Sequence, residues 1–212
     1  MKIAVIDYKM SNMFSIRNAL NSLGFNSEIT ADAKTILSSD GAVLPGVGSF
    51  PEAMRQLSDF GLVRVIQDYI ASGKPFMGIC LGLQLLFTKS DEFEECEGLG
   101  IIDGSVEGFV KYVPNKPVPH VGWNTVINKN TENCDKKRPL SKIKLEDSEY
   151  YYFVHSFFVK PSNNKVVLTT TRYGNFEFCS SIIFENVFAC QFHPEKSGKK
   201  GIKIFDEFFR KE

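Results

Sequence analysis

Short apolar runs alternate with helix-like patterns over the first half of the chain. Residues 3–6, 41–44 and 76–79 are apolar at successive positions, a pattern typical of strands buried on both faces of a parallel sheet. Helical spacing of apolar side chains occurs between these runs, from about Ser11 to Gly24 and near residues 50–58 and 62–71. Strands that alternate with helices predict βαβ units with right-handed crossovers.

The second half has a different pattern, rich in β-branched and aromatic residues. The stretches concerned are residues 101–110, 118–127, 150–159, 165–173 and 180–192. Such stretches predict mixed or antiparallel strands that extend the same sheet. Residues 128–138 are polar and charged and predict a surface loop. A terminal helix should follow, with apolar positions at Ile202, Ile204, Phe205, Phe208 and Phe209. We therefore expect one α/β domain that spans residues 1–212.

Composition and charge narrow the functional classes. The chain has 212 residues, of which 43% are hydrophobic, as in ordinary globular domains. Lys plus Arg equals Asp plus Glu at 25 each, so the formal net charge is zero. A neutral chain has no electrostatic footprint for nucleic acid or for an anionic membrane. We expect neither as a partner.

The N-terminal segment and the spacing of the cysteines bear on the cellular compartment of the protein. The first apolar run is short and is interrupted by Asp7, so it predicts neither a signal peptide nor a membrane span. The five cysteines are scattered and no two form a CxxC pair. This spacing argues against a disulfide framework and favours a reducing cytoplasm, where a free thiol survives.

The segment Gly78-Ile79-Cys80-Leu81-Gly82 joins a predicted buried strand to a predicted helix over residues 81–87. Its pattern is that of a nucleophile elbow, with Cys in place of Ser. Glycines flank the nucleophile because larger side chains would clash in so tight a turn. The start of a helix favours thiolate over thiol, and the N–H of Leu81 can stabilise an oxyanion. Taken alone, Cys80 could equally be a small buried apolar residue.

A thiolate needs a partner for proton transfer, and His193 is the best placed of three histidines. It follows the apolar run that ends at Cys190, so it can project from the same sheet edge as the elbow. Glu195, two residues later, can orient the imidazole and stabilise its cation. Without the cysteine elbow, this segment would be interpreted as a surface turn.

The loop at residues 44–50 follows another predicted strand and contains Gly46, Val47 and Gly48. Its backbone N–H groups could complete an oxyanion hole together with Leu81. A phosphate-binding loop is the alternative, but the spacing is not that of a P-loop or of a dinucleotide fingerprint.

Together these segments resemble the class I, triad-type glutamine amidotransferases. The resemblance spans essentially the whole chain, and within the family it is closest to the HisH glutaminase subunits of imidazole glycerol phosphate synthase. It is carried by residues 6–8, 44–48, 78–84, 119–124, 152–156 and 191–197. It implies a flavodoxin-like three-layer sandwich, in which a mixed, largely parallel sheet is flanked by helices.

The resemblance also implies a chemistry, in which Cys80 attacks the side-chain amide of L-glutamine with the help of His193 and Glu195. Ammonia leaves, and water hydrolyses the glutamyl thioester that remains. Neither a cofactor nor a metal is implied, and the spacings of His120, His155 and His193 match no metal-ligand motif. The residues implied to form the oxyanion hole and to bind glutamine are Val47, Gly48, Leu81, Gln84, His155 and Ser156.

A partner is implied as well, a HisF-type (β/α)8 cyclase that receives the ammonia in a heterodimer. The residues implied to contact it are Asn12, Pro119, His120, Trp123, Tyr152 and Lys196. Departures from the family pattern occur at residues 9–12, which read Lys-Met-Ser-Asn, and at Phe157 and Phe158, where tyrosines are usual. A paralogue that serves a sugar-modifying synthase, a stand-alone γ-glutamyl hydrolase or thiol protease, and a non-catalytic module are the alternatives.

Overall fold

The computed structural model describes residues 1–10, 12–129, 143 and 145–210. The elements of the first half are β1 (Lys2–Ile6), α1 (Met13–Ser22), β2 (Asn26–Thr30), α2 (Ala33–Ser38), β3 (Gly41–Gly46), α3 (Phe50–Asp59), α4 (Leu62–Ala71), β4 (Phe76–Cys80) and α5 (Leu81–Gln84). Those of the second half are β5 (Phe87–Ser90), β6 (Cys96–Glu97), β7 (Ile102–Gly108), β8 (His120–Thr125), β9 (Ile127–Asn128), β10 (Tyr150–His155), β11 (Phe157–Pro161), β12 (Val167–Tyr173), β13 (Phe176–Phe184), β14 (Val187–Cys190) and α6 (Gly198–Phe209). Short 3-10 turns lie at Phe109–Lys111, Asn164–Val166 and Pro194–Lys196.

One mixed sheet forms the centre of the molecule. Its strand order over the described residues is β2-β1-β3-β4-β14-β13-β11-β7-β5-β6, and β12 and β9 branch from β13. The strands from β2 to β14 are parallel, and β13, β11 and β7 continue the sheet in antiparallel pairs. The parallel half predicted from the alternation of strands and helices is therefore confirmed.

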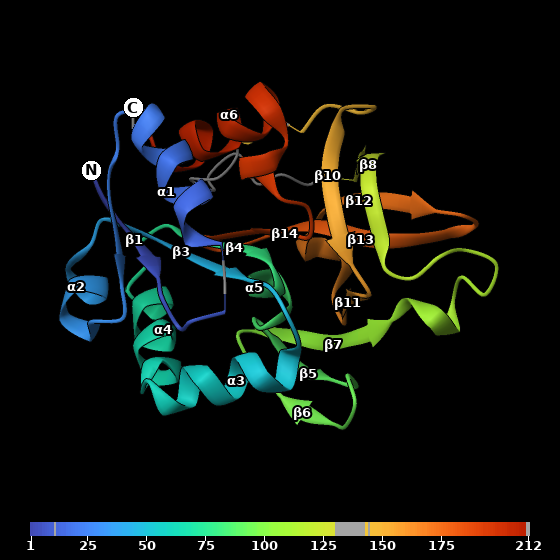
Figure 1. Ribbon diagram of the computed structural model, residues 1–212, viewed down its shortest axis with the longest axis horizontal. Helices are drawn as coiled ribbons and strands as arrows, with labels where there is room; N and C mark the ends of the chain where they lie inside the picture. The colour runs from blue at the N-terminus through green and yellow to red at the C-terminus, as the bar shows by residue number, and fades with distance from the viewer. Residues whose placement is uncertain (11, 130–142, 144, 211–212) are drawn as a thin grey trace.

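Helices cover both faces of the parallel half (Figure 1). Side chains of successive strand residues point to opposite faces. Ile3 and Val5 of β1 accordingly pack into the core beneath α1 and α6, whereas Ala4 and Ile6 pack into the core beneath α2, α3 and α4. Both faces are buried, which explains why these strands are apolar at every position. The α/β sandwich implied by the resemblance is the observed fold.

The aromatic-rich half differs from expectation in two places. Strands β8 and β10 form a separate two-stranded antiparallel sheet, with Trp123 opposite Tyr152, instead of extending the main sheet. The chain bends at Ser156, so only β11 reaches β7 and β13. The stretch 180–192 is not one strand, because β13 ends and β14 begins at a turn where Glu185 has φ of 50°.

Three further details correct or limit the sequence-based prediction. The helix expected over residues 81–87 ends at Gln84, because Phe87 starts β5 and pairs with Ile102 of β7. Strand β2 and helix α2 were not predicted, since four of the five residues of β2 are polar and α2 is short. The expected loop at 128–138 lies outside the described residues from position 130 onward. None of the helices in the described ranges has the length and apolar character needed to cross a bilayer.

The order of the parallel strands gathers three loops at one edge of the sheet. Strand β4 lies between β3 and β14, with Gly46 opposite Cys80 and Cys190 opposite Ile79. The carboxyl ends of parallel neighbours meet at the same edge. The elbow after β4, the glycine loop after β3 and the segment after β14 are therefore neighbours in space.

Backbone contact at Gly82 holds the elbow against β3. A Cβ atom at Gly82 would lie 1.8 Å from the carbonyl oxygen of Leu44, which is a backbone atom and cannot swing aside. Helix α5 can approach β3 this closely only because residue 82 has no side chain.

We expect Gly82→Ala to destabilise the chain by at least about 3 kcal/mol, because the clash requires α5 and β3 to separate. Urea unfolding followed by circular dichroism measures the change. Gly24→Ala is the matched control, since Gly24 has φ of 82° and open space around its Cβ position. Its cost should be only the backbone strain, about 1 to 2 kcal/mol. Equal losses in the two variants would contradict the packing role of Gly82.

Candidate active site

Cys80 occupies a strained position between β4 and α5. Its φ of 55° and ψ of −109° lie outside the usual regions for a residue with a side chain, and only 6% of it is exposed. Strained conformations of this kind persist where the surrounding packing enforces them. Here the enforcing contact is the close approach of Gly82 to Leu44. The elbow predicted from the sequence is thus present in the backbone.

His193 and Glu195 form a buried pair after β14. Nδ1 of His193 lies 2.8 Å from Oε1 of Glu195, and both side chains are almost fully buried. The turn that carries them is fixed by Ser197, whose hydroxyl donates to the carbonyl of His193 and accepts from the N–H of Tyr152. With Nδ1 engaged, Nε2 is the ring atom left for proton exchange, and it makes no hydrogen bond within the described residues.

The charge of His193 depends on its two neighbours. Burial lowers the pKa of the imidazole, but Cys80 and Glu195 outweigh burial and raise the pKa to about 10. Cys80 contributes the larger of the two raising effects on the pKa of His193, and Glu195 the smaller. At neutral pH His193 is therefore an imidazolium between a carboxylate and a sulfur. A general acid held in this form can protonate a leaving amine.

A cavity of about 280 Å³ adjoins Cys80. All six residues implied to bind glutamine or to form the oxyanion hole line it, although they come from three separate segments of the chain. The lining residues are Val47, Gly48, Cys80, Leu81, Gln84, Glu92, Pro119, Val154, His155, Ser156 and Phe157. His193 and Glu195 are not among them. The pair of His193 and Glu195 therefore lies outside this cavity.

Glu92 is a cavity residue that sequence reasoning missed. Its carboxylate is buried and accepts a hydrogen bond of 2.7 Å from the N–H of Phe50 at the start of α3. Burial raises the pKa of Glu92 above its usual value. It is the one carboxylate among the residues that line the cavity, and it lies in an acid-rich segment whose carboxylates the sequence alone does not distinguish.

The glycine loop after β3 differs from the oxyanion hole that was expected. The N–H of Val47 donates to the carbonyl of Met10 at 2.8 Å, so it is not free to bind a substrate oxygen. The hydroxyl of Tyr8 donates to the carbonyl of Pro45 at 2.7 Å and holds the start of the loop. Gly48, with φ of 94°, has the backbone freedom that a change of loop conformation requires.

Most residues implied to contact a partner lie on the surface. Trp123 is 55% exposed, and the ring centroids of Trp123 and Tyr152 are 6.0 Å apart. The ammonium of Lys196 lies 5.9 Å from the ring centroid of Tyr152. Asn12 and Pro119 are also exposed.

Two exposed residues of the β8–β10 sheet were not predicted as contacts. Val121 is 55% exposed and stands two positions before Trp123 on β8, so the two side chains share a face. Tyr150 on β10 is 60% exposed. Their apolar side chains enlarge the exposed patch around Trp123 and Tyr152.

His120 is the exception, because it is only 3% exposed. Its ring packs against those of Phe153 and Tyr173, and its Nδ1 lies 3.0 Å from Nε2 of His155. This burial corrects the expectation that the side chain is part of an exposed surface. Within the part of the chain that the structure describes, no cluster of three or more His, Cys, Asp or Glu side chains could hold a metal.

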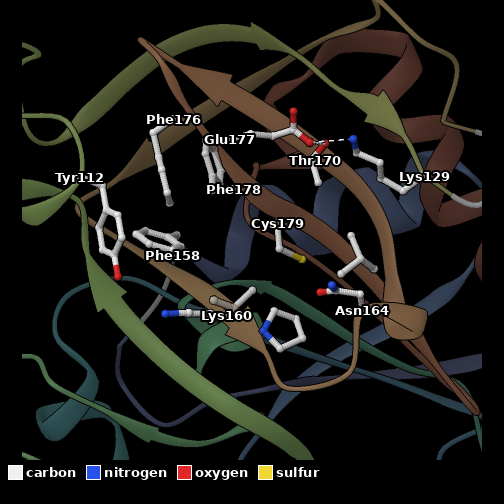
Figure 2. Close-up of a pocket in the computed structure, with 13 residues that line it drawn as sticks. Tyr112, Lys129, Phe158, Lys160, Asn164, Thr170, Phe176, Glu177, Phe178 and Cys179 are labelled. Carbon is white, nitrogen blue, oxygen red and sulfur yellow. Dashed lines mark hydrogen bonds and ion pairs between the residues drawn. The ribbon is translucent and has the colours of Figure 1, made fainter.

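A larger cavity, of about 600 Å³, lies on the antiparallel half of the sheet (Figure 2). The rings of Tyr112, Phe158, Phe176 and Phe178 gather toward one end. At the other end, the ammonium of Lys129 is paired with the Glu177 carboxylate at 2.7 Å. Burial raises the pKa of the Cys179 thiol to about 12, so it stays protonated. None of the residues that line this cavity is an activated nucleophile. The larger volume therefore does not make it the candidate active site.

A cysteine elbow with a buried His–Glu pair, on an α/β sheet, defines a class of enzymes that hydrolyse amides through a thioester. Comparisons with known proteins narrow this class. Residues 4–211 match the family model described as glutamine amidotransferase class-I. The chain is 45% identical over 206 residues to imidazole glycerol phosphate synthase subunit HisH of Caldanaerobacter subterraneus, covering 97% of this chain and 96% of that relative. The HisH subunit of Aquifex aeolicus is also 45% identical, over 213 residues.

Solved structures agree on the fold. A crystal structure of a glutamine amidotransferase superposes with a TM-score of 0.71 at 16% identity, covering 97% of this chain and 98% of that one. The structure of PurLQS from Thermotoga maritima superposes with a TM-score of 0.70 at 20% identity, covering 98% and 96%. The chain belongs to the class I glutamine amidotransferases and, within them, to the HisH family.

The three histidines should titrate in a fixed order when their ring resonances are followed by NMR. His193 should lose its proton near pH 10, whereas burial lowers the pKa of His120 to about 4 and that of His155 to about 3. Glu195→Gln should lower the pKa of His193, because it removes the charge that Nδ1 faces. An unchanged titration of His193 in that variant would exclude the proposed pairing.

The same shift predicts how stability depends on pH. The pKa of His193 is higher in the folded chain than the value of about 6.5 in an unfolded one. The resulting stabilisation is complete below about pH 6.5 and is lost as the pH rises through about 10. Glu195→Gln should lose less stability over this window than the original chain.

Proposed function

We propose that Cys80, His193 and Glu195 form the catalytic triad of a glutaminase subunit in histidine biosynthesis, and that its ammonia passes to a HisF-type cyclase. The observation that carries this proposal is the buried pair of His193 and Glu195, joined at 2.8 Å, at the same sheet edge as the strained elbow of Cys80. The match over residues 4–211 supports a single amidotransferase domain. The scattered free thiols fit a reducing cytoplasm.

The reaction follows from the charges of the triad. The Cys80 thiolate attacks the side-chain carbonyl carbon of L-glutamine, and a tetrahedral oxyanion forms. His193 gives its proton to the nitrogen as the C–N bond breaks, which releases ammonia and leaves a glutamyl thioester. The neutral imidazole then takes a proton from water as the water attacks the thioester. Glutamate leaves, and the thiolate and imidazolium are restored.

Glu92 and Gln84 are placed to hold the substrate. The buried Glu92 carboxylate matches the α-ammonium group of glutamine, because a buried charge is most stable opposite another charge. The amide of Gln84 lies on the same cavity, as do His155 and Ser156. These contacts would set the side-chain amide of the substrate against Cys80.

The oxyanion hole explains why the isolated subunit should be a weak glutaminase. The N–H of Leu81 follows the nucleophile directly, but a second donor would have to come from the loop that contains Val47 and Gly48. The N–H of Val47 is bonded to Met10 in this conformation. Rotation of the Val47–Gly48 peptide, which the glycine permits, would supply the donor. Losing one such donor typically lowers the rate by about a hundredfold or more.

The exposed aromatic patch is the surface we assign to the cyclase. Trp123, Val121, Tyr150 and Tyr152 offer apolar area, and Lys196 adds a cation at its border. Aromatic residues of this kind dominate binding energy at protein interfaces. There the ammonia would convert a phosphoribulosyl formimino intermediate into imidazole glycerol phosphate and an aminoimidazole carboxamide ribotide.

Cys80→Ala should abolish glutamine-dependent turnover by the complex with a HisF-type cyclase. Turnover with ammonium salts should stay within about twofold, because that substrate bypasses the thioester. Both rates are measured as formation of imidazole glycerol phosphate. Cys96→Ala, at a partly exposed thiol of the same chain, is the control and should retain both activities. If Cys80→Ala lost both activities while the complex stayed intact, the proposed separation of roles would be wrong.

Trp123→Ala should weaken the complex by about ten- to a hundredfold, as expected for an exposed aromatic at the centre of an interface. Calorimetric titration with the cyclase measures the dissociation constant. Leu37→Ala removes an exposed apolar side chain from α2, far from the β8–β10 sheet in Figure 1, and should leave it unchanged. Equal effects of the two substitutions would place the interface elsewhere.

A further inference from the structure

A chain of side-chain amides leads from the glutamine cavity to the nucleophile. Nε2 of Gln84 donates to the carbonyl of Phe157 and to Oε1 of Gln191, each at 3.0 Å. Nε2 of Gln191 in turn donates to Sγ of Cys80 at 3.6 Å. Gln191 is completely buried, and its backbone N–H is anchored to the carbonyl of Ser180. The triad mechanism above assigns no task to Gln191.

The partners determine which way each amide points. The carbonyl of Phe157 can only accept, so Gln84 must present its NH2 group there, and its second N–H reaches Gln191. Gln191 must therefore present its oxygen to Gln84 and its NH2 group to the sulfur. The flipped amide would set two NH2 groups against each other and a carbonyl oxygen against Cys80. Unfavourable contacts of this kind raise the free energy most where the groups are buried and water cannot satisfy them.

The sulfur consequently meets a donor that does not depend on its protonation state. As a thiol, Cys80 can also donate to the carbonyl of Val154, at 3.8 Å. As a thiolate it has no hydrogen to give, and the bond from Gln191 becomes charge-assisted and stronger. Little water reaches Cys80 to replace that bond, because the residue is almost fully buried.

We propose that Gln191 is a positioning residue that stabilises the Cys80 thiolate through its amide N–H, with its orientation set by Gln84. The proposal rests on the triad function proposed above. Oε1 of Gln84 makes no hydrogen bond within the described residues and can accept one from a bound substrate. A substrate contact at Gln84 would then polarise both amides and strengthen the bond to the sulfur.

Gln191→Met tests this role, because methionine keeps a similar length and volume but has no N–H. The rate at which iodoacetamide alkylates Cys80, read by mass spectrometry of its peptide, reports the thiolate directly. At pH 7 we expect this rate to fall about tenfold, with the midpoint of its pH profile moved upward, as for loss of one hydrogen bond to a charged group. Gln191→Asn, whose amide is one methylene too short, should not restore it.

Asn186→Leu is the matched control. Asn186 is also a buried amide, at the opposite end of β14, and its Nδ2 donates to the carbonyls of Ile70 and Lys74. Its replacement should lower the melting temperature and leave the alkylation profile of Cys80 unchanged. If Gln191→Met shifted only the melting temperature, as Asn186→Leu does, Gln191 would be structural and the proposal would be wrong.

A measurement on the unaltered chain covers the case in which Gln191→Met does not fold. The side-chain amide resonance of Gln191 should shift when iodoacetamide modifies Cys80, whereas that of Asn186 should not. An unmoved Gln191 resonance would overturn the proposal. The triad is tested separately, because it predicts that the same modification abolishes glutamine-dependent turnover. Retention of that turnover would refute the triad, whatever Gln191 does.

Discussion

The site depends on one close backbone contact, the approach of Gly82 to the carbonyl of Leu44. This contact presses the first turn of α5 against β3, and it leaves Cys80 in a backbone conformation that a free chain would avoid. The neighbouring parallel strands then bring two other loops to the same edge, one after β3 and one after β14. Cys80, the His193–Glu195 pair and a cavity wall from distant parts of the chain thus lie at one edge of the sheet.

Burial and neighbouring groups together decide the charge states of the three histidines. Burial by itself disfavours the charge on His193, yet the two neighbours of the ring reverse that effect and raise its pKa. His120 and His155 show the opposite outcome, because burial lowers the pKa of both and no carboxylate among the described residues offsets that effect. The same residue type is therefore charged at one position and neutral at two others. The difference comes from the two neighbours of the His193 ring, Cys80 first and the paired carboxylate of Glu195 second.

Two segments of the chain join cavity residues to residues of the proposed partner surface. Val47 donates to Met10, and Met10 lies just before Asn12, one of the residues assigned to the partner surface. The β8–β10 sheet offers a second connection, because Val154 and His155 at the end of β10 line the cavity, while Trp123 is exposed and Tyr152 is half-buried beside it.

The amino-acid sequence by itself determined three of the parallel strands, β1, β3 and β4, most of the helices, the elbow at Cys80 and the family. Those features depend on local apolar periodicity and on glycines with local tasks, which are visible residue by residue. Only the tertiary structure decided that β8 and β10 leave the main sheet and that His120 is buried. It also decided that Glu92 lines the cavity and that Gln191 donates to the sulfur of Cys80. The physical reason is that these outcomes depend on contacts between residues far apart in the chain, such as Gln191 with Cys80, which no local pattern encodes.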